Sequence, residues 1–174
     1  MKFKILIVIN TNIEENDISF NNYIINNLDS ADIRICTIGP KIVKATTIYE
    51  YNYNIHQNNY TYSKWISLTN EIINNIFDDF IPDLVVLNNY NLTSVGAGIA
   101  AYFIGTQIHL FEPLLIDETL ISCFPMDRGF EILLNLVDFH FCSKNENIKI
   151  LENYKIHNCK QARNYILGNY IKET

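Results

Sequence analysis

Residues 82–142 read PDLVVLNNYNLTSVGAGIAAYFIGTQIHLFEPLLIDETLISCFPMDRGFEILLNLVDFHFC, and this stretch decides the fold. Short apolar runs typical of buried strands alternate in it with longer patterns typical of helices. We expect strands at 84–87, 106–111 and 139–142, and helices at 94–104 and 129–136. Strands separated by helices indicate a parallel sheet covered by those helices.

The same alternation continues outward on both sides of this stretch. We expect further strands at 2–9, 31–38, 48–55 and 165–167, and further helices at 18–28, 63–77 and 145–154. The sequence contains neither an internal repeat nor a linker-like segment. It therefore predicts an α/β fold in one domain spanning 1–174, a three-layer Rossmann-like parallel sheet with helices on both faces.

The composition limits which partners and which cellular compartment we expect for this protein. The chain has 174 residues, 48% of them hydrophobic, and a net charge of -6. Nucleic acids and anionic membranes attract clustered Lys and Arg, so this charge argues against both as partners. The four cysteines form no CxxC pair, and the first apolar run is too short for a signal peptide. We expect reduced thiols and a cytoplasmic protein.

The apolar positions of 82–142 resemble those of the non-hydrolysing UDP-N-acetylglucosamine 2-epimerases. Where that family carries His-Gly-Asp, this chain has Asn88-Asn89-Tyr90. Glu112 matches the Glu that opens the family's Glu-Ala-Gly-Leu-Arg-Thr, and Pro125 matches the start of its Pro-Glu-Glu. The resemblance implies the amino-terminal, Rossmann-like half of a GT-B fold, without the carboxy-terminal half that binds UDP in the family.

The resemblance also implies which residues would carry chemistry. In the family a base removes the proton at C2 of the sugar, UDP departs, and UDP adds back, which requires at least two groups with tuned pKa values. Tyr90 stands in place of the family's Asp, and a phenol with a pKa near ~10 is a poor base at neutral pH. Glu112 and Asp127 remain as the catalytic candidates.

Ligand-binding candidates lie at the expected strand ends. The family's Gly-Thr-Arg-Pro-Glu turn is replaced by Asn10-Thr11-Asn12-Ile13-Glu14, which removes a cation that would hold phosphate. His109 lies two residues before Phe111 and close in sequence to Glu112. The candidates for ligand binding are Asn10, Asn12, Asn88, Tyr90, His109 and Glu112.

Two further patterns suggest a cofactor and a metal. The run Gly96-Ala97-Gly98-Ile99-Ala100-Ala101 fits a dinucleotide-binding pattern, but it does not follow the first strand. The epimerase family has small residues there for close packing of the helix against the sheet, and we expect no cofactor. His140, Cys142, His157 and Cys159 lack the tight spacing of zinc knuckles, so we expect no metal.

Three functions follow from these observations. The first is a degenerate, stand-alone epimerase-like domain, a pseudoenzyme that binds a nucleotide sugar or related ligand as a regulatory or oligomeric subunit. The second is half of a split isomerase, a nucleotide-sugar 2-epimerase completed by a separate UDP-binding chain. The third is a self-association module that exposes Trp65, Tyr60 and Phe80. A homo-oligomer is expected.

Overall fold

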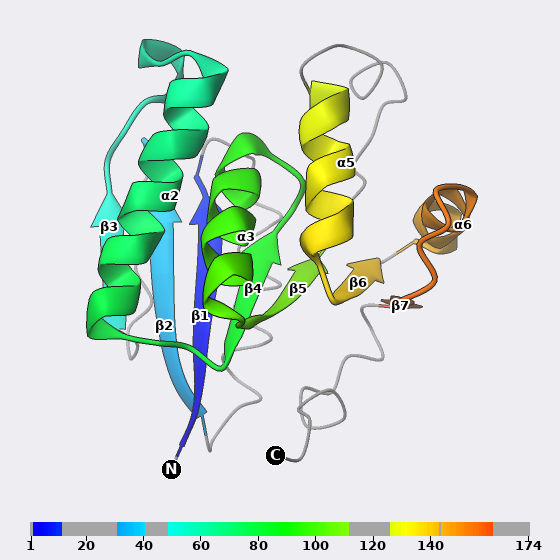
Figure 1. Ribbon diagram of the computed structural model, residues 1–174, viewed down its shortest axis with the longest axis horizontal. Helices are drawn as coiled ribbons and strands as arrows, with labels where there is room; N and C mark the ends of the chain where they lie inside the picture. The colour runs from blue at the N-terminus through cyan, green and yellow to red at the C-terminus, as the bar shows by residue number, and fades with distance from the viewer. Residues whose placement is uncertain (1, 12–30, 41–48, 112–125, 143, 162–174) are drawn as a thin grey trace.

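One parallel sheet organises the molecule. The computed structural model describes residues 2–11, 31–40, 49–111, 126–142 and 144–161. Seven strands of this part pair in the order β3-β2-β1-β4-β5-β6-β7, all parallel (Figure 1). They are β1 (Phe3–Asn10), β2 (Ala31–Ile38), β3 (Tyr49–Tyr53), β4 (Leu84–Asn88), β5 (Gln107–Phe111), β6 (Phe139–Cys142) and β7 (Cys159–Gln161). The predicted Rossmann-like parallel α/β sheet is confirmed.

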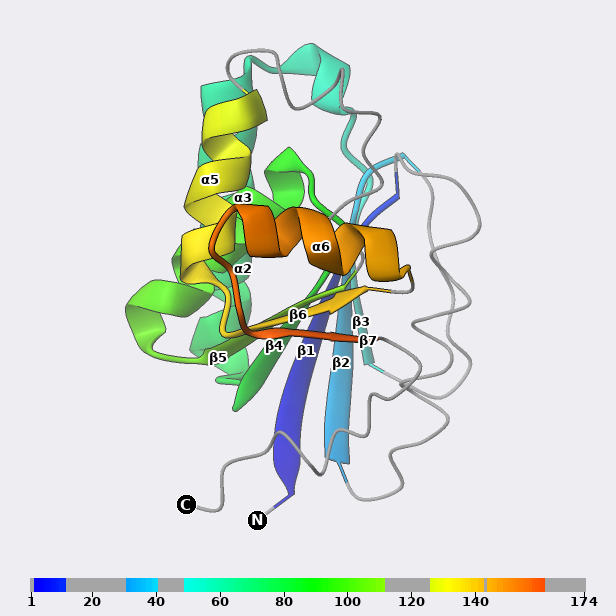
Figure 2. The same ribbon diagram turned by 90° about the vertical axis from the view of Figure 1, so that its right-hand side faces the viewer.

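Helices α2 (Tyr62–Asp79), α3 (Leu92–Ile104) and α5 (Met126–Leu136) lie on one face of this sheet, which we call the helix face (Figures 1 and 2). The other side is called the opposite face. Helix α6 (Asn145–Asn153) packs at the β6–β7 edge, and a short 3-10 helix, η1 (Gln57–Asn59), precedes α2. The helix expected at 18–28 and the strand expected at 165–167 lie outside the described residues.

The strands alternate their side chains between two cores. Leu6 and Val8 of β1 belong to the core of the helix face. Ile5 and Ile7 belong to the core of the opposite face. Because successive strand residues point to opposite faces, β1 can be apolar almost throughout only if both faces are covered. This explains why its sequence shows a continuous apolar run.

Glycines let α3 pack closely against its neighbours. A Cβ added at Gly96 would lie 2.7 Å from the carbonyl oxygen of Ile66 and 2.8 Å from Cβ of Thr69, both on α2. One added at Gly98 would lie 2.9 Å from Cδ1 of Leu133 on α5. Gly96 and Gly98 therefore serve the packing of α3 against α2 and α5, whereas the resemblance had implied packing of this helix against the sheet.

Several expectations need correction. Trp65 and Phe80 are 0% and 1% exposed, so neither can form the exposed surface that the self-association function assumed. Tyr60 is exposed as expected. Strand β7 was not expected, and α2 and α3 begin earlier than the helical patterns suggested.

Two further findings concern the compartment. In the described part of the chain, no helix is both long and apolar enough to span a membrane. Cys36 and Cys159 are free thiols. A cytoplasmic location stays a prediction.

Candidate functional site

The strand order marks the place where a ligand would bind. From β1 the chain continues to β2 on one side, and it later returns to β4 on the other side of β1. In open α/β sheets, ligands bind beyond the carboxyl ends of the strands where the order reverses in this way. The candidate site is therefore the carboxyl edge of β1 and β4, together with the start of α3.

On the helix face, this edge is closed by a network of neutral side chains. The carboxamide Nδ2 of Asn10 donates to Oγ1 of Thr93 at 3.1 Å and to Oδ1 of Asn91 at 3.4 Å. The indole Nε1 of Trp65 donates to the same Thr93 oxygen at 3.0 Å. All four residues are buried. The end of β1 is thereby joined to both α2 and α3.

The same residues close the amino terminus of α3. The backbone N–H of Ser94 donates to Oδ1 of Asn91 at 2.9 Å, which is a helix N-cap. The Ser94 hydroxyl donates to the carbonyl oxygen of Asn89 at 2.7 Å. Helix amino termini commonly bind phosphate through such N–H groups. Here the protein's own carboxamide occupies that position.

Asn89 makes the sharp turn from β4 into α3. Its φ is 65°, in the left-handed region that Asn tolerates better than most residues. Its N–H donates to the carbonyl oxygen of Phe111 at 2.8 Å, which extends the pairing of β4 with β5. The resemblance places a Gly at this position in the epimerases, and Gly adopts the same conformation readily.

Tyr90 faces helix α5. Its ring packs edge-on against Phe130, with centroids 4.9 Å apart and planes at 77°. A Cβ added at Gly129 would lie 3.1 Å from the Tyr90 hydroxyl oxygen, so the phenol lies directly against this helix. The side chain that stands in place of the family's Asp is therefore half-buried in a packing contact.

Asn88 and His109 lie on the opposite face. Asn88 pairs with Phe111, and His109 pairs with Val86 two residues earlier on β4. His109 is 0% exposed and contacts the rings of Phe139 and Phe141 at centroid distances of 5.5 and 5.4 Å. Burial lowers the pKa of His109 to about 3. The imidazole is therefore neutral at pH 7.

The structure divides the predicted site residues between the two faces. Asn10 and Tyr90 lie on the helix face, while Asn88 and His109 lie on the opposite face. Asn12 and Glu112 lie outside the described residues, as does the side chain of Asp127 in the first turn of α5. The catalytic roles of Glu112 and Asp127 stay predictions.

Sequence reasoning missed Asn91, Thr93 and Trp65 as residues of this site. Asn91 had a readable signal, because an Asn three residues before Ser94 fits the N-cap position of a helix. The hydrogen bond from Trp65 to Thr93 joins residues 28 positions apart. No local pattern indicates that contact.

Charge is absent from the described side chains at this edge. The ends of β1, β4 and β5 and the first residues of α3 carry carboxamides, hydroxyls and aromatic rings. Among the described residues, none of the buried polar side chains is Asp, Glu, Lys or Arg. No group of three or more His, Cys, Asp or Glu side chains in this part of the protein is placed to hold a metal ion.

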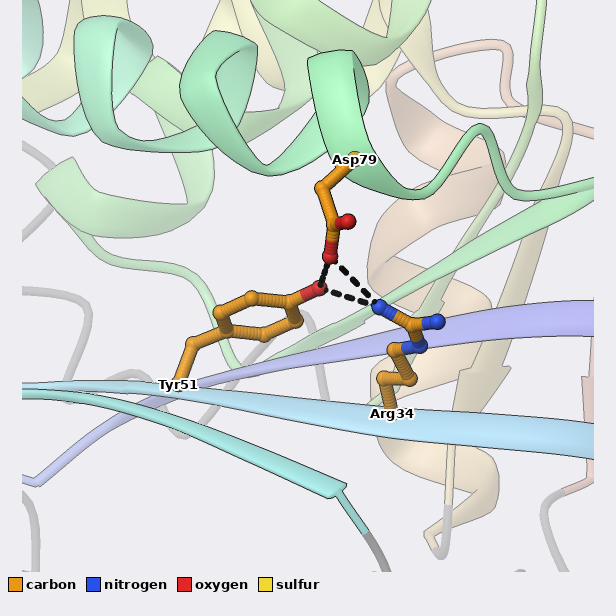
Figure 3. Close-up of polar contacts among 3 residues, drawn as sticks. All are labelled: Arg34, Tyr51 and Asp79. Atoms are coloured by element: carbon orange, nitrogen blue, oxygen red, sulfur yellow. Dashed lines mark hydrogen bonds and ion pairs between the residues drawn. The ribbon is translucent and has the colours of Figure 1, made fainter.

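A charged cluster lies instead at the carboxyl end of α2 (Figure 3). One guanidinium nitrogen of Arg34 donates to the Tyr51 hydroxyl at 2.6 Å and pairs with Oδ2 of Asp79 at 2.8 Å. The Tyr51 hydroxyl donates to the same carboxylate at 2.8 Å, and Arg34 lies 4.2 Å from the Phe80 ring centroid. Hydrogen bonds from Tyr51 and then Arg34 lower the pKa of Asp79. This cluster fastens α2 to β2 and β3.

Comparisons with known proteins agree on the fold. Neither a family model nor a curated protein sequence matches the chain. Among solved structures, a UDP-N-acetylglucosamine 2-epimerase gives a TM-score of 0.74 at 17% identity, over 92% of this chain and 48% of that one. The Neisseria meningitidis enzyme bound to UDP-GlcNAc gives 0.73 at 18% identity, over 91% and 45%.

The Methanocaldococcus jannaschii enzyme in complex with UDP-GlcNAc and UDP gives a TM-score of 0.66 at 16% identity, over 91% of this chain and 46% of that one. The chain thus spans about half the length of these similar structures. It has the fold of one half of a UDP-N-acetylglucosamine 2-epimerase, consistent with the amino-terminal half that the resemblance of residues 82–142 implied.

Proposed function

We propose that this chain binds a nucleotide sugar, or a related small ligand, at the carboxyl edge of its sheet and does not epimerise it alone. The observation that carries the proposal is the reversal of strand order at β1 and β4, where the described side chains at the carboxyl edge are uncharged. Similar structures contain UDP-GlcNAc, which supports a ligand of this class.

The chemistry of the described edge supports binding over catalysis. Proton transfer at carbon requires a group whose pKa lies near the working pH. Carboxamides and hydroxyls donate and accept hydrogen bonds but do not take up protons near pH 7. His109 is neutral and buried among aromatic rings, so it is poorly suited to act as a base at this edge.

Isothermal titration calorimetry tests this proposal. We expect saturable binding of UDP-GlcNAc, and weaker binding of ADP, which lacks both the uracil base and the N-acetylglucosamine. Asp79→Asn provides a matched control variant, because Asp79 lies at the end of α2 and belongs to the separate charged cluster. Equal binding of both nucleotides, or no binding of either, would contradict the proposal.

The second candidate is one half of a split epimerase. The chain resembles one half of two similar enzymes, 45% to 48% of their length. A separate chain would then supply the UDP-binding half, with Glu112 and Asp127 acting in catalysis. Affinity purification of the tagged chain from its own organism should recover that partner and epimerase activity. Full activity of the complex carrying Glu112→Gln would exclude this role for Glu112.

Self-association can use a different surface from the one expected. Tyr102, Phe103 and Ile104 at the end of α3 are 54%, 83% and 41% exposed, and Ile81 is 66% exposed. The Thr106 hydroxyl donates to the carbonyl oxygen of Pro82 at 3.1 Å, which links the two chain segments. Exposed apolar surface of this kind favours association. Light scattering of the wild type and of Phe103→Glu measures the oligomeric state. A monomeric wild type would exclude self-association through this surface.

A further inference from the structure

The side chain of Asn88 differs from the other carboxamides of the site. It is 4% exposed, and within the described part of the chain its carboxamide makes no hydrogen bond. Its main-chain carbonyl accepts bonds from Asn91 and Ser94, so only the side chain lacks partners. Asn10 and Asn91, by contrast, use their carboxamides within the network.

The carboxamide of Asn88 is available for a new partner. Most buried polar groups in proteins are hydrogen-bonded to protein or to water. The atoms of the Asn88 carboxamide are not among the described side-chain atoms that are closed off from solvent without a partner. Asn88 is also the last residue of β4, at the reversal of strand order where ligands bind. It pairs with Phe111 and shares the face of the sheet that carries Val86. The position thus combines an unused polar group with an apolar, aromatic surrounding.

We propose that Asn88 determines the specificity of the ligand site by pairing with an amide or lactam group of the ligand. This inference rests on the proposed function. A carboxamide presents an N–H donor and an oxygen acceptor side by side in one plane. The uracil ring presents a C=O and an N–H side by side and can take both bonds at once. The acetamido group of an N-acetylated sugar is a trans amide whose C=O and N–H point in opposite directions, so it can form one of the two bonds. The neighbouring Phe111 adds an apolar surface for the rest of either group.

This role predicts different effects on stability and on binding. Leu has nearly the shape of Asn, so Asn88→Leu removes the carboxamide without breaking a side-chain hydrogen bond among the described residues. We expect its Tm to stay within about 2 °C of the wild-type value. The same substitution should weaken ligand binding at least tenfold. A purely structural Asn would lower Tm when replaced.

Calorimetry on the full chain distinguishes the two ligand groups. The probes are UDP-GlcNAc, UDP-glucose and UDP, each titrated into the wild type and Asn88→Leu. If the acetamido group is the partner, the wild type prefers UDP-GlcNAc over UDP-glucose, and the variant loses that preference. If uracil is the partner, the variant weakens binding of all three probes by the same factor. Either result supports the inference.

Asn158→Leu is the matched control. The Asn158 carboxamide donates to the carbonyl oxygen of Val137 at 3.2 Å, away from the candidate site. This variant should lose stability and keep the wild-type affinity. Unchanged affinity in Asn88→Leu, or a Tm more than about 2 °C below the wild-type value, would overturn the role of Asn88 while leaving the proposed function intact. A wild type that binds none of the three probes would overturn both.

Discussion

At the carboxyl edge, the polar side chains on the two faces of the sheet differ in their hydrogen bonding. On the helix face, Asn10, Asn91 and Thr93 bond to one another and to Trp65, and they close the amino terminus of α3. On the opposite face, the carboxamide of Asn88 has no partner among the described residues. The helix-face groups have a structural role, whereas the carboxamide of Asn88 is the group that we propose binds a ligand.

The residues that stabilise the fold and the residue that we propose recognises the ligand therefore lie close together at one edge of the sheet. The helix-face network resists substitution, because each removed group leaves a buried donor or acceptor unsatisfied. The opposite face is expected to tolerate an apolar replacement at Asn88 and to lose ligand binding. Four further predictions test the contrast.

Lowering the pH should reduce the free energy of unfolding more than any of the substitutions described below, because each face of the sheet carries one buried neutral histidine. Burial lowers the pKa of His109 on the opposite face to about 3 and that of His140 on the helix face to about 4, both from 6.5. Between pH 6.5 and about 4 the unfolded chain therefore binds more protons, and the free energy of unfolding falls as pH decreases. Urea unfolding at pH 7.5 and 5 should show a loss of roughly 2 kcal/mol per histidine.

Single variants assign that loss to each face. His109→Leu and His140→Leu should each remove about half of the pH dependence. If both variants retain the full pH dependence, the two histidines are not its source.

Thr93→Val tests the network on the helix face. Valine keeps the shape of threonine but removes the oxygen that accepts from Asn10 and Trp65. Leaving two buried donors unsatisfied should lower the free energy of unfolding by about 3 kcal/mol in urea. Thr93→Ser keeps the hydroxyl and should cost clearly less. Equal losses in the two variants would show that the hydroxyl bonds contribute little.

Gly96→Ala tests the packing that holds α3 beside this network. The added methyl would meet the backbone carbonyl oxygen of Ile66, which cannot move without shifting α2. Overpacking should outweigh the better helix propensity of Ala and reduce stability by about 2 kcal/mol. Gly98→Ala meets only the end of the flexible Leu133 side chain and should be nearly neutral. The reverse order, measured by thermal unfolding, would contradict this packing.

Asp79→Asn should have the smallest effect. The Arg34–Tyr51–Asp79 cluster is charged, but the Asp79 side chain is 63% exposed, so water screens its ion pair. We expect unfolding in urea to be nearly unchanged at pH 7 and at both low and high salt. A large, salt-sensitive loss would show that this cluster, and not the buried network, is the main polar attachment of α2.

The sequence was sufficient to predict most strands of the sheet, but it predicted fewer of the contacts between side chains. The strands at 31–38 and 139–142 were predicted with the observed bounds, because each contains enough apolar residues to be recognised locally. Strand β7 contains only Cys159–Gln161 and depends on pairing with β6, which leaves no local signal. Trp65 was expected on the surface because its burial depends on α3, which follows much later in the chain.

The candidate site was predicted in location and only partly in composition. Asn10 and Asn88 were chosen because they stand where the epimerase family carries two of its motifs, and both lie at the carboxyl edge. The division of these residues between two faces depends on strand register, which the alternation of apolar runs does not fix. Only the three-dimensional structure shows that, among the described residues, the carboxamide of Asn91 is hydrogen-bonded while that of Asn88 is not.

Proton NMR of the purified chain with UDP-GlcNAc in heavy water shows whether the chain binds this ligand without epimerising it. Saturation-transfer signals report binding, and the intensity of the sugar proton at C2 reports whether any base removes it. We expect transfer signals from the ligand with no loss of that proton. Replacement of the proton by deuterium, or the absence of any transfer signal, would contradict the proposed function.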